Sequence, residues 1–397
     1  MHSHPDSSHS LWSFSLVFLL VSFNLRMSFA AADPLLVFLM RELHLGISSG
    51  TLFGLIPIIA LGLAAPLGAW LCNFIRPRRL ITLSMLVALG GILWRSYGAL
   101  PGLFGGMLII GLGLGVTGSV ILGIARQVVP TKNLPRLMAG YTACVSLGTA
   151  AGSGAADPVE LWLGNWQESL LFWGLPLLFA TILWHWHVHR HPSVDVSRQN
   201  TVHAPLGHCL RRRKAWYITF FYMFRVAGNW LLTVWLASLM RKRGLPLVES
   251  GMVLAISTLC QIPGALLTPH LLSRLKSHSG SLLLIIMPLA VTACSMMLLA
   301  PLKWWLAGAV LFGLCSGIIF AMGMTFIILN AKGEADTLAL SGMAQGIGFI
   351  GGGLLAWWGG SLALQQAAPH YAICLLYALF TLGGLINGWK SAPQAEI

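Results

Sequence analysis

Long apolar segments alternate with short polar connections along almost the whole chain. Twelve of these segments are long enough to cross a bilayer, since one membrane-spanning helix needs roughly 20 apolar residues. We place them at 11–32, 48–72, 80–98, 101–124, 137–156, 168–188, 215–239, 247–269, 280–300, 302–329, 338–362 and 370–389. Because most connections are too short to form a folded domain, the pattern predicts an all-α integral membrane protein.

The longest polar stretch, 189–214, separates the segments into two sets of six. We therefore expect a first six-helix bundle at 11–188, a cytoplasmic linker at 189–214 and a second bundle at 215–389, with tails at 1–10 and 390–397. The second half repeats glycine positions of the first at an offset of 202 residues. The repeated pairs are Gly111 with Gly313, Gly115 with Gly317, and Gly140 with Gly342. This repeat predicts two pseudo-symmetric halves.

Composition supports the membrane assignment and excludes one class of partner. Hydrophobic residues make up 56% of the chain and charged residues 9%, against about 25% charged in soluble domains. The net charge of +13 does not indicate nucleic-acid binding, because the basic residues fall mostly in alternate connections. The positive-inside rule then places both termini in the cytoplasm. The three basic residues at 241–243 depart from this rule.

Two arginines interrupt the apolar segments. Arg26 lies in the first segment, two residues after Asn24, and Arg225 lies midway along the seventh, one turn before Asn229. A cation at this depth costs at least about 2.5–3.5 kcal/mol on insertion scales, so it is tolerated mainly beside a protein-lined cavity. The pattern predicts a polar chamber that receives an anionic or strongly polar solute. Alternatively, Asp33 forms a structural ion pair with Arg26, or couples transport to a proton.

Three segments, FNLRMSFAAADPLL, RLMAGYTACVSLGTAAGSG and LSGMAQGIGFIGGG, resemble the cyanate transporter and 2-nitroimidazole transporter family of the major facilitator superfamily. The resemblance implies the major facilitator fold with twelve transmembrane helices, alternating access and a small polar or anionic substrate. It also implies substrate-binding roles for Asn24, Arg26 and Gln345. Arg225 stands where family members have asparagine, and Asp33 where they have a small residue. In the loop after the second segment, Cys72 replaces the acid of the superfamily signature.

The remaining candidate site residues are polar or aromatic groups inside the segments. Asn229, Gln261 and Gln345 would orient a substrate bound by the two arginines, whose planar guanidinium groups suit small anions. Trp230 would form an apolar wall, and Tyr141 would add a hydroxyl. Alternatively, Tyr141 and Gln345 form hydrogen bonds that pack helices together. The alternative role of the tryptophans is to lie at the membrane–water interface.

These features favour a secondary active transporter of a small anionic or polar nitrogen-containing solute, such as cyanate, a nitro-heterocycle or a small carboxylate. The alternatives are an exporter of bulkier amphipathic compounds and a non-transporting membrane sensor. We expect no enzymatic activity, because no intramembrane His–carboxylate pair is present in the sequence. We expect no cofactor or metal, since the two G-x-G-x-x-G runs do not follow strands and the histidines at 185–191 lack further ligands. A monomer in the bacterial inner membrane is expected.

Overall fold

The computed structural model of the protein describes residues 5–32, 35, 47–97, 100–190, 206–275 and 279–392. These residues form helices and connecting turns, with no β-strand in the described ranges. The helices of the first half are α1 (Pro5–Ala30), α3 (Ile47–Leu71), α4 (Pro77–Tyr97), α5 (Leu100–Val128), α6 (Leu134–Leu163), α7 (Trp166–Phe172) and α8 (Gly174–Arg190). The second half contains α9 (Leu206–Arg211), α10 (Arg213–Lys242), α11 (Leu247–Leu275), α12 (Ser279–Leu298), α13 (Trp305–Leu329), α14 (Glu334–Leu364) and α15 (Pro369–Ser391).

Each of the twelve segments expected from the sequence corresponds to helical structure. The sixth is divided between α7 and α8, which meet at Trp173. Within the described residues, ten helical stretches are long and apolar enough to cross a membrane. The other two spans are α3, whose described apolar part is shorter, and α6, which is rich in Gly, Ala, Ser and Thr. The predicted all-α membrane fold of twelve helices is therefore confirmed.

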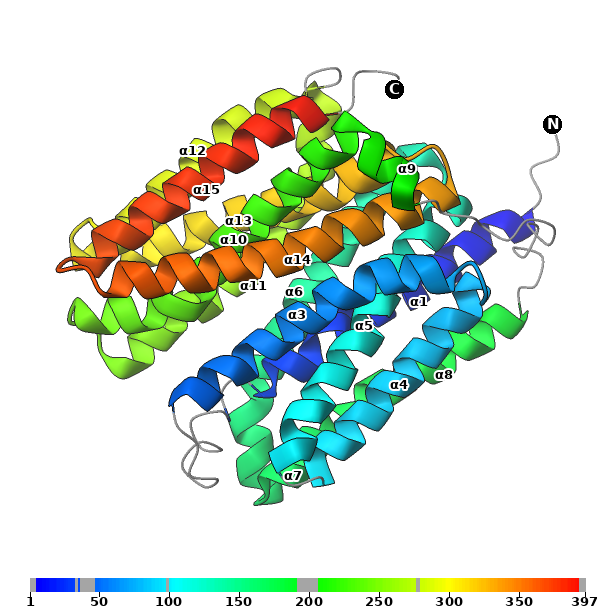
Figure 1. Cartoon of the computed structure of the whole chain (residues 1–397), viewed down its shortest axis with the longest axis horizontal. Coiled ribbons are helices and arrows are strands. Elements are labelled where there is room, and N and C mark those ends of the chain that lie inside the picture. Colours follow the sequence, from blue (N-terminus) through cyan, green and yellow to red (C-terminus); the bar gives the residue numbers. More distant parts are fainter. Residues whose placement is uncertain are drawn as a thin grey trace.

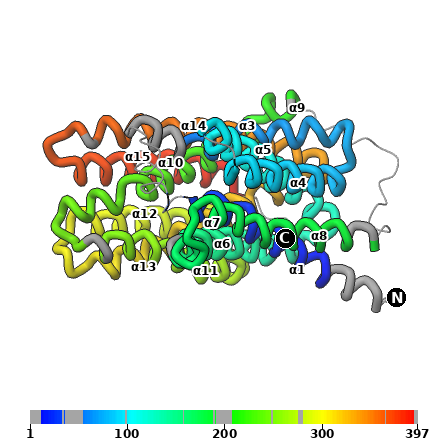
Figure 2. The backbone as a smooth tube through the Cα atoms, turned by 90° about the horizontal axis from the view of Figure 1, so that it is seen from below, coloured from blue at the N-terminus to red at the C-terminus, as the bar shows by residue number. Residues whose placement is uncertain are grey.

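The two halves use equivalent helix pairs. In the first half α5 packs against α3 and α4, and in the second α13 packs against α11 and α12. Between the halves α3 contacts α14, and α6 contacts α11. These two interfaces lie on opposite faces of the molecule (Figure 2). The start of α1 and the end of α15 lie at the end of the molecule that carries α9 (Figure 1).

Repeated glycines allow the equivalent helices to approach closely. A Cβ atom on Gly111 or Gly115 would overlap alanine side chains of α3, and one on Gly313 or Gly317 would overlap backbone carbonyl oxygens of α11. The third pair is not equivalent, because Gly140 lies against α1 whereas Gly342 lies against α3 of the other half. Two of the three sequence pairs thus mark the same helix contact in both halves.

Substitution of Gly313 by valine is expected to destabilise the protein by about 1–3 kcal/mol, as overpacking of a close contact usually does. The added side chain would collide with the carbonyl oxygen of Ser257 and the Cβ of Cys260. Thermal unfolding of the purified protein in detergent measures the effect. Gly90→Val is the matched control, since nothing lies within 4 Å of a Cβ at that exposed helical position. Equal stability of the two variants would contradict the proposed packing.

Two arginines at the end remote from α9 bind the carboxyl ends of helices. Arg95 is completely buried, and its guanidinium donates to Ser28 O at 2.9 Å and Leu170 O at 3.2 Å, in the last turns of α1 and α7. Arg243 donates to Met297 O in the last turn of α12, and to Ala300 O. The last carbonyls of a helix have no partner within it and carry partial negative charge. This role explains why Arg243 departs from the positive-inside pattern.

Candidate functional site

A cavity of about 610 Å³ lies between the two halves. Its walls come from α1, α3, α5 and α6 on one side and from α10, α11, α13 and α14 on the other. Seven of the eight expected substrate-binding residues line it. They are Arg26, Tyr141, Arg225, Asn229, Trp230, Gln261 and Gln345. The structure therefore brings together residues from both repeats of the chain, as far apart in sequence as Arg26 and Gln345.

Asn24 is the exception, because it is fully buried away from the cavity. Its side-chain amide donates to Leu20 O at 2.9 Å, within α1. Two residues along an α-helix correspond to about 200° of rotation, so Asn24 and Arg26 cannot share a face. The expected substrate contact of Asn24 is corrected to a position in the helix packing. Asp33, expected to couple transport to protons, lies outside the described residues.

Arg225 is held among aromatic rings. Its guanidinium carbon lies 4.1 Å from the ring centroid of Phe320 and 5.0 Å from that of Tyr222. Its Nε is buried and has no hydrogen-bond partner among the described residues. Among the described residues, the ion pair that forms joins Arg212 to Asp336 at the α9 end of the molecule. Within these residues, Arg225 therefore has no carboxylate partner to balance its charge. A buried cation without an anionic partner is energetically costly.

Arg26 connects the two halves through a cation–π contact. Its guanidinium carbon lies 4.9 Å from the ring centroid of Trp230, which belongs to α10 of the second half. The arginine is half-buried and lines the cavity. Cation–π contacts of this kind contribute about 0.5–2 kcal/mol, depending on solvent access. The first and second halves therefore meet at a cationic and an aromatic side chain on the cavity wall.

Most other polar groups of the wall already have hydrogen-bond partners. The hydroxyls of Thr149, Ser153, Thr233 and Thr258 donate to carbonyls one turn earlier in their own helices. Gln345 Nε2 donates to Ser341 Oγ at 2.7 Å, within α14. Asn229 Oδ1 accepts from Ser316 Oγ at 3.2 Å, and Ser316 is not a cavity residue. The wall thus offers a solute fewer free hydrogen-bonding groups than its composition suggests.

Sequence reasoning missed Tyr222, Phe320 and Phe349, which also line the cavity. The hydroxyl of Tyr222 is buried without a hydrogen-bond partner in the described structure. Tyr222 precedes Arg225 by three residues, and that spacing places two side chains on the same helix face. This signal was available in the sequence. The two phenylalanines carry no such signal, because Phe is an ordinary apolar residue of membrane spans and occurs 18 times in the chain.

The cavity has exposed lining residues at the end of the molecule opposite α9. Ser153 and Gly154 of α6 and Gly251 of α11 line it and are exposed. Because successive spans alternate in direction, these residues lie in the halves of their helices remote from α9. No Asp or Glu is among the described residues that line the cavity. The site is therefore a one-ended chamber with permanently positive groups and aromatic walls.

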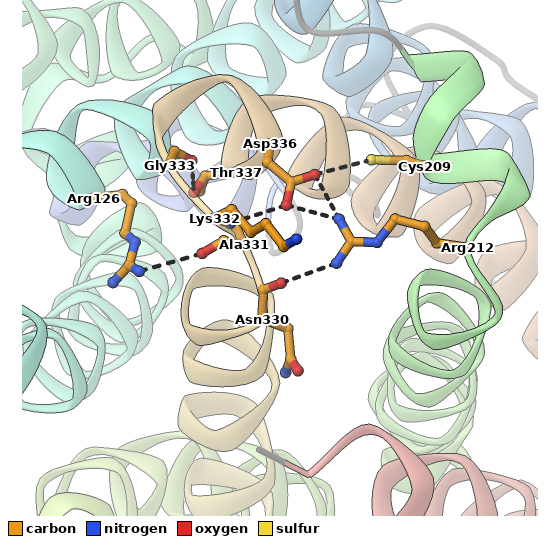
Figure 3. Close-up of polar contacts among 9 residues, drawn as sticks. All are labelled: Arg126, Cys209, Arg212, Asn330, Ala331, Lys332, Gly333, Asp336 and Thr337. Atoms are coloured by element: carbon orange, nitrogen blue, oxygen red, sulfur yellow. Dashed lines mark hydrogen bonds and ion pairs between the residues drawn. The ribbon is translucent and has the colours of Figure 1, made fainter. Parts of the chain in front are cut away.

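At the α9 end the connection between α13 and α14 is held from two sides (Figure 3). Arg126 of α5 donates to Ala331 O at 3.3 Å, which links the first half to this connection. Arg212, between α9 and α10, donates to both carboxylate oxygens of Asp336 at 2.7 Å and to Asn330 O at 3.2 Å. These contacts join the two halves at the α9 end of the molecule, beyond the closed end of the cavity.

The missing acid of the signature loop has a counterpart on the opposite half. Glu334, in the first turn of α14, interacts electrostatically with Cys72 and with Arg78 of α4. Glu334 of the second half therefore places a carboxylate near Cys72, which stands where the superfamily signature has an acid.

Cys209 is expected to react with N-ethylmaleimide at pH 7.5 at least about 100-fold more slowly in the folded protein than after denaturation. Burial, reinforced by the carboxylate of Asp336, raises the pKa of its thiol from 9.0 to about 11. A higher pKa lowers the thiolate fraction at pH 7.5, and the thiolate is the reactive form. Peptide-resolved mass spectrometry measures the rates. Asp336→Asn is expected to raise the folded-state rate, and equal rates in the folded and denatured wild type would refute the assignment.

Comparison with known proteins identifies the fold and the family. The model of the Major Facilitator Superfamily matches residues 18–356. The chain belongs to the Major Facilitator Superfamily. It is therefore a multi-pass membrane transporter and not an enzyme. As a member of this superfamily it combines two six-helix halves around the cavity described above.

Similar proteins of known name include two transporters of Escherichia coli (strain K12). The chain is 27% identical to the cyanate transport protein CynX, over 95% of this chain and 97% of that protein. It is also 27% identical to the 2-nitroimidazole transporter, over 84% of this chain and 83% of that protein. The uncharacterized transporter YycB of Bacillus subtilis (strain 168) is 24% identical over 88% of this chain and 86% of that protein.

Solved structures with the same fold include FucP in the outward conformation, with a TM-score of 0.72, 15% identity, and coverage of 96% of this chain and 100% of that one. The proton:xylose symporter XylE gives a TM-score of 0.75 with 12% identity, covering 98% of this chain and 97% of that one. At these identities the likeness concerns the fold alone.

Proposed function

We propose that this superfamily member is a secondary active transporter of a small anionic or polar nitrogen-containing solute, working by alternating access. The observation that carries the proposal is the half-buried side chain of Arg225, whose Nε is buried. This arginine has no carboxylate partner in the described structure and lines a cavity shared by both halves. An anionic solute would supply the missing counter-charge. The printed names of two relatives, for cyanate and 2-nitroimidazole, agree with small solutes of this chemistry.

A cavity that opens at one end and is closed at the other supports the proposal of alternating access. With both termini in the cytoplasm, as the positive-inside rule predicts, the α9 end faces inward and the chamber faces outward. Movement of the halves would separate Arg126 from Ala331 and close the outer interface. We further propose that Asp33 carries the coupling proton. The protein is expected to act as a monomer, since one chain provides a complete chamber.

A second candidate is the export of bulkier amphipathic compounds. The size of the cavity and its aromatic residues favour this alternative. An exporter of neutral or cationic compounds would not depend on Arg225. The two proposals therefore differ in the charge of the solute that competes for the site.

Flux into proteoliposomes tests the proposed function. Purified protein would be reconstituted and loaded with an unlabelled anion, and exchange would be followed with radiolabelled cyanate, nitrate and small carboxylates. Saturable exchange of the labelled anion for the internal anion is the expected result, together with net anion uptake when an inward proton gradient is imposed. Anion binding without exchange would identify a sensor, and exchange only of cationic or neutral amphipathic compounds would identify an exporter. Either result would reject the proposal.

A further inference from the structure

We propose that the solute of the central cavity is a planar aromatic monocarboxylate, and not a three-atom inorganic anion. The inference rests on the proposed transport function and concerns the same cavity. It defines which part of the cavity would hold the carboxylate and which part would hold the ring. Three independent features support it, namely the two free donors, the size of the chamber and the arrangement of aromatic side chains.

The free donors form a site suited to a carboxylate. Arg225 Nε and Tyr222 Oη are both buried, and neither atom has a hydrogen bond of good geometry among the described residues, although the guanidinium and the phenol interact with each other. They lie three residues apart on α10 and both line the cavity. A carboxylate presents two oxygen acceptors, so one group can accept from the guanidinium and from the phenol together. Hydrogen bonds to a charged group are stronger than those between neutral groups.

The size of the chamber exceeds what a three-atom anion requires. Pockets that enclose drug-sized organic ligands usually have volumes of roughly 300–1,000 Å³. The cavity, at about 610 Å³, falls within this range. A cyanate or nitrate ion bound at Arg225 would leave most of the chamber filled with water. Such a solute would gain no contact with the apolar wall, which includes Leu61, Leu114 and Leu254.

Aromatic rings surround the free donors. Tyr222 and Phe349 form an edge-to-face pair with centroids 5.7 Å apart, and Tyr141 and Phe320 form another at 6.5 Å. Trp230 adds a fifth ring, beside Arg26. All five residues line the cavity. Aromatic side chains favour edge-to-face or offset contacts with another ring, and guanidinium planes also stack on aromatic faces. A flat aryl group therefore finds more favourable contacts here than a saturated ring of similar volume.

The charge balance limits the solute to an anion. No Asp or Glu lines the cavity within the described residues, whereas Arg26 and Arg225 are always protonated. A cationic aromatic solute would be repelled. A neutral one, such as an aromatic amide, would leave Arg225 without a counter-charge. One carboxylate is enough to balance Arg225, for which the described structure gives no anionic partner.

Binding of four matched probes to the purified full-length protein tests the proposal. Benzoate, cyclohexanecarboxylate, acetate and benzamide separate the contributions of the ring's aromaticity, its apolar surface and the charge. We expect benzoate to bind about 3–10-fold more tightly than cyclohexanecarboxylate, as the usual strength of aromatic pairing implies. Acetate is expected to bind about 10–100-fold more weakly than benzoate, because it buries no ring. Benzamide is expected to bind about 10-fold more weakly or worse, because it carries no charge.

Phe320→Leu provides the matched variant. It removes one ring from the cavity wall but keeps an apolar side chain, so the preference for benzoate over cyclohexanecarboxylate is expected to fall toward one. Phe179→Leu is the control, because Phe179 is exposed on α8 and does not line the cavity. An unchanged preference in Phe320→Leu would overturn the proposed ring site.

The outcomes separate this inference from the proposed function. If acetate, cyanate or benzamide binds as tightly as benzoate, the solute is not specifically an aromatic monocarboxylate. If acetate or cyanate does so, anion exchange in proteoliposomes would still support the transporter proposal. If no anion binds or exchanges in the wild-type protein, the proposed function itself fails. Tighter binding of benzoate together with loss of preference in Phe320→Leu would support both.

Discussion

Substitution of Arg225 by glutamine is expected to reduce anion exchange by about 30-fold or more, because it removes the charge-assisted hydrogen bonds that would hold the solute. The same substitution is expected to leave the thermal stability of the solute-free protein unchanged or higher. Arg225 is half-buried between Tyr222 and Phe320 without a carboxylate partner in the described structure, so no ion pair offsets the partial removal of its charge from water. Loss of exchange without loss of stability is the result specific to a binding role.

Arg241→Gln is the matched control for this experiment. Arg241 lies on the same helix, α10, but is exposed in its last turn and does not line the cavity. The control removes the same charge, and we expect its exchange rate to stay near that of the wild type. Wild-type exchange in Arg225→Gln would exclude Arg225 from the binding site. A strongly destabilised Arg225→Gln protein would show instead that the arginine has a structural role.

Substitution of Arg95 by methionine is expected to destabilise the protein by about 2–6 kcal/mol. Methionine fills part of the same space but donates no hydrogen bond, so Ser28 O and Leu170 O would lose their partner. Each buried acceptor left without a donor costs about 1–3 kcal/mol. The apparent midpoint of thermal unfolding in detergent, compared with wild type, measures the effect. Arg95→Lys is expected to lower the free energy of unfolding by about half as much as Arg95→Met, since an ammonium group can reach one of the two carbonyls.

The graded series distinguishes helix capping from a simple requirement for charge. If only the positive charge stabilised the fold, Arg95→Lys would be as stable as wild type. If neither the charge nor the hydrogen bonds to the helix ends stabilised it, Arg95→Met would be as stable as the exposed control Arg241→Met, and the capping role would be rejected. Because Arg95 lies outside the cavity, the lysine variant should retain the anion preference of the wild type.

The lengths of the apolar segments were sufficient to predict the fold, because in a bilayer each span must satisfy its backbone hydrogen bonds internally. The intramembrane charges were sufficient to place Arg26 and Arg225 on one cavity, since few other environments tolerate them. Segment length could not reveal the break between α7 and α8 at Trp173, which leaves the segment apolar on both sides. Asn24 was misplaced because its proximity to Arg26 in sequence was given more weight than its angle around the helix.

Other features depend on tertiary contacts that no local pattern contains. Arg95 lies near the outer end of the third apolar segment, where exposure would be expected, yet it is fully buried because two helices end beside it. The pairing of Arg212 with Asp336 joins positions 124 residues apart. Glu334 could not be recognised as the counterpart of the missing acid near Cys72, because the relation appears only when α14 packs against the first half.

The contacts of Arg126 and Arg212 with the connection between α13 and α14 end on main-chain oxygens, those of Ala331 and Asn330. Every amino acid supplies such an oxygen, but Ala331 is buried, so residue 331 is free to vary only among small side chains while the loop keeps its length and path. Arg126 has no such freedom, because only a long side chain with a donor reaches that oxygen. A deep mutational scan should therefore find position 126 intolerant and position 331 open to small residues, and a one-residue deletion in the loop should be as harmful as loss of the arginine.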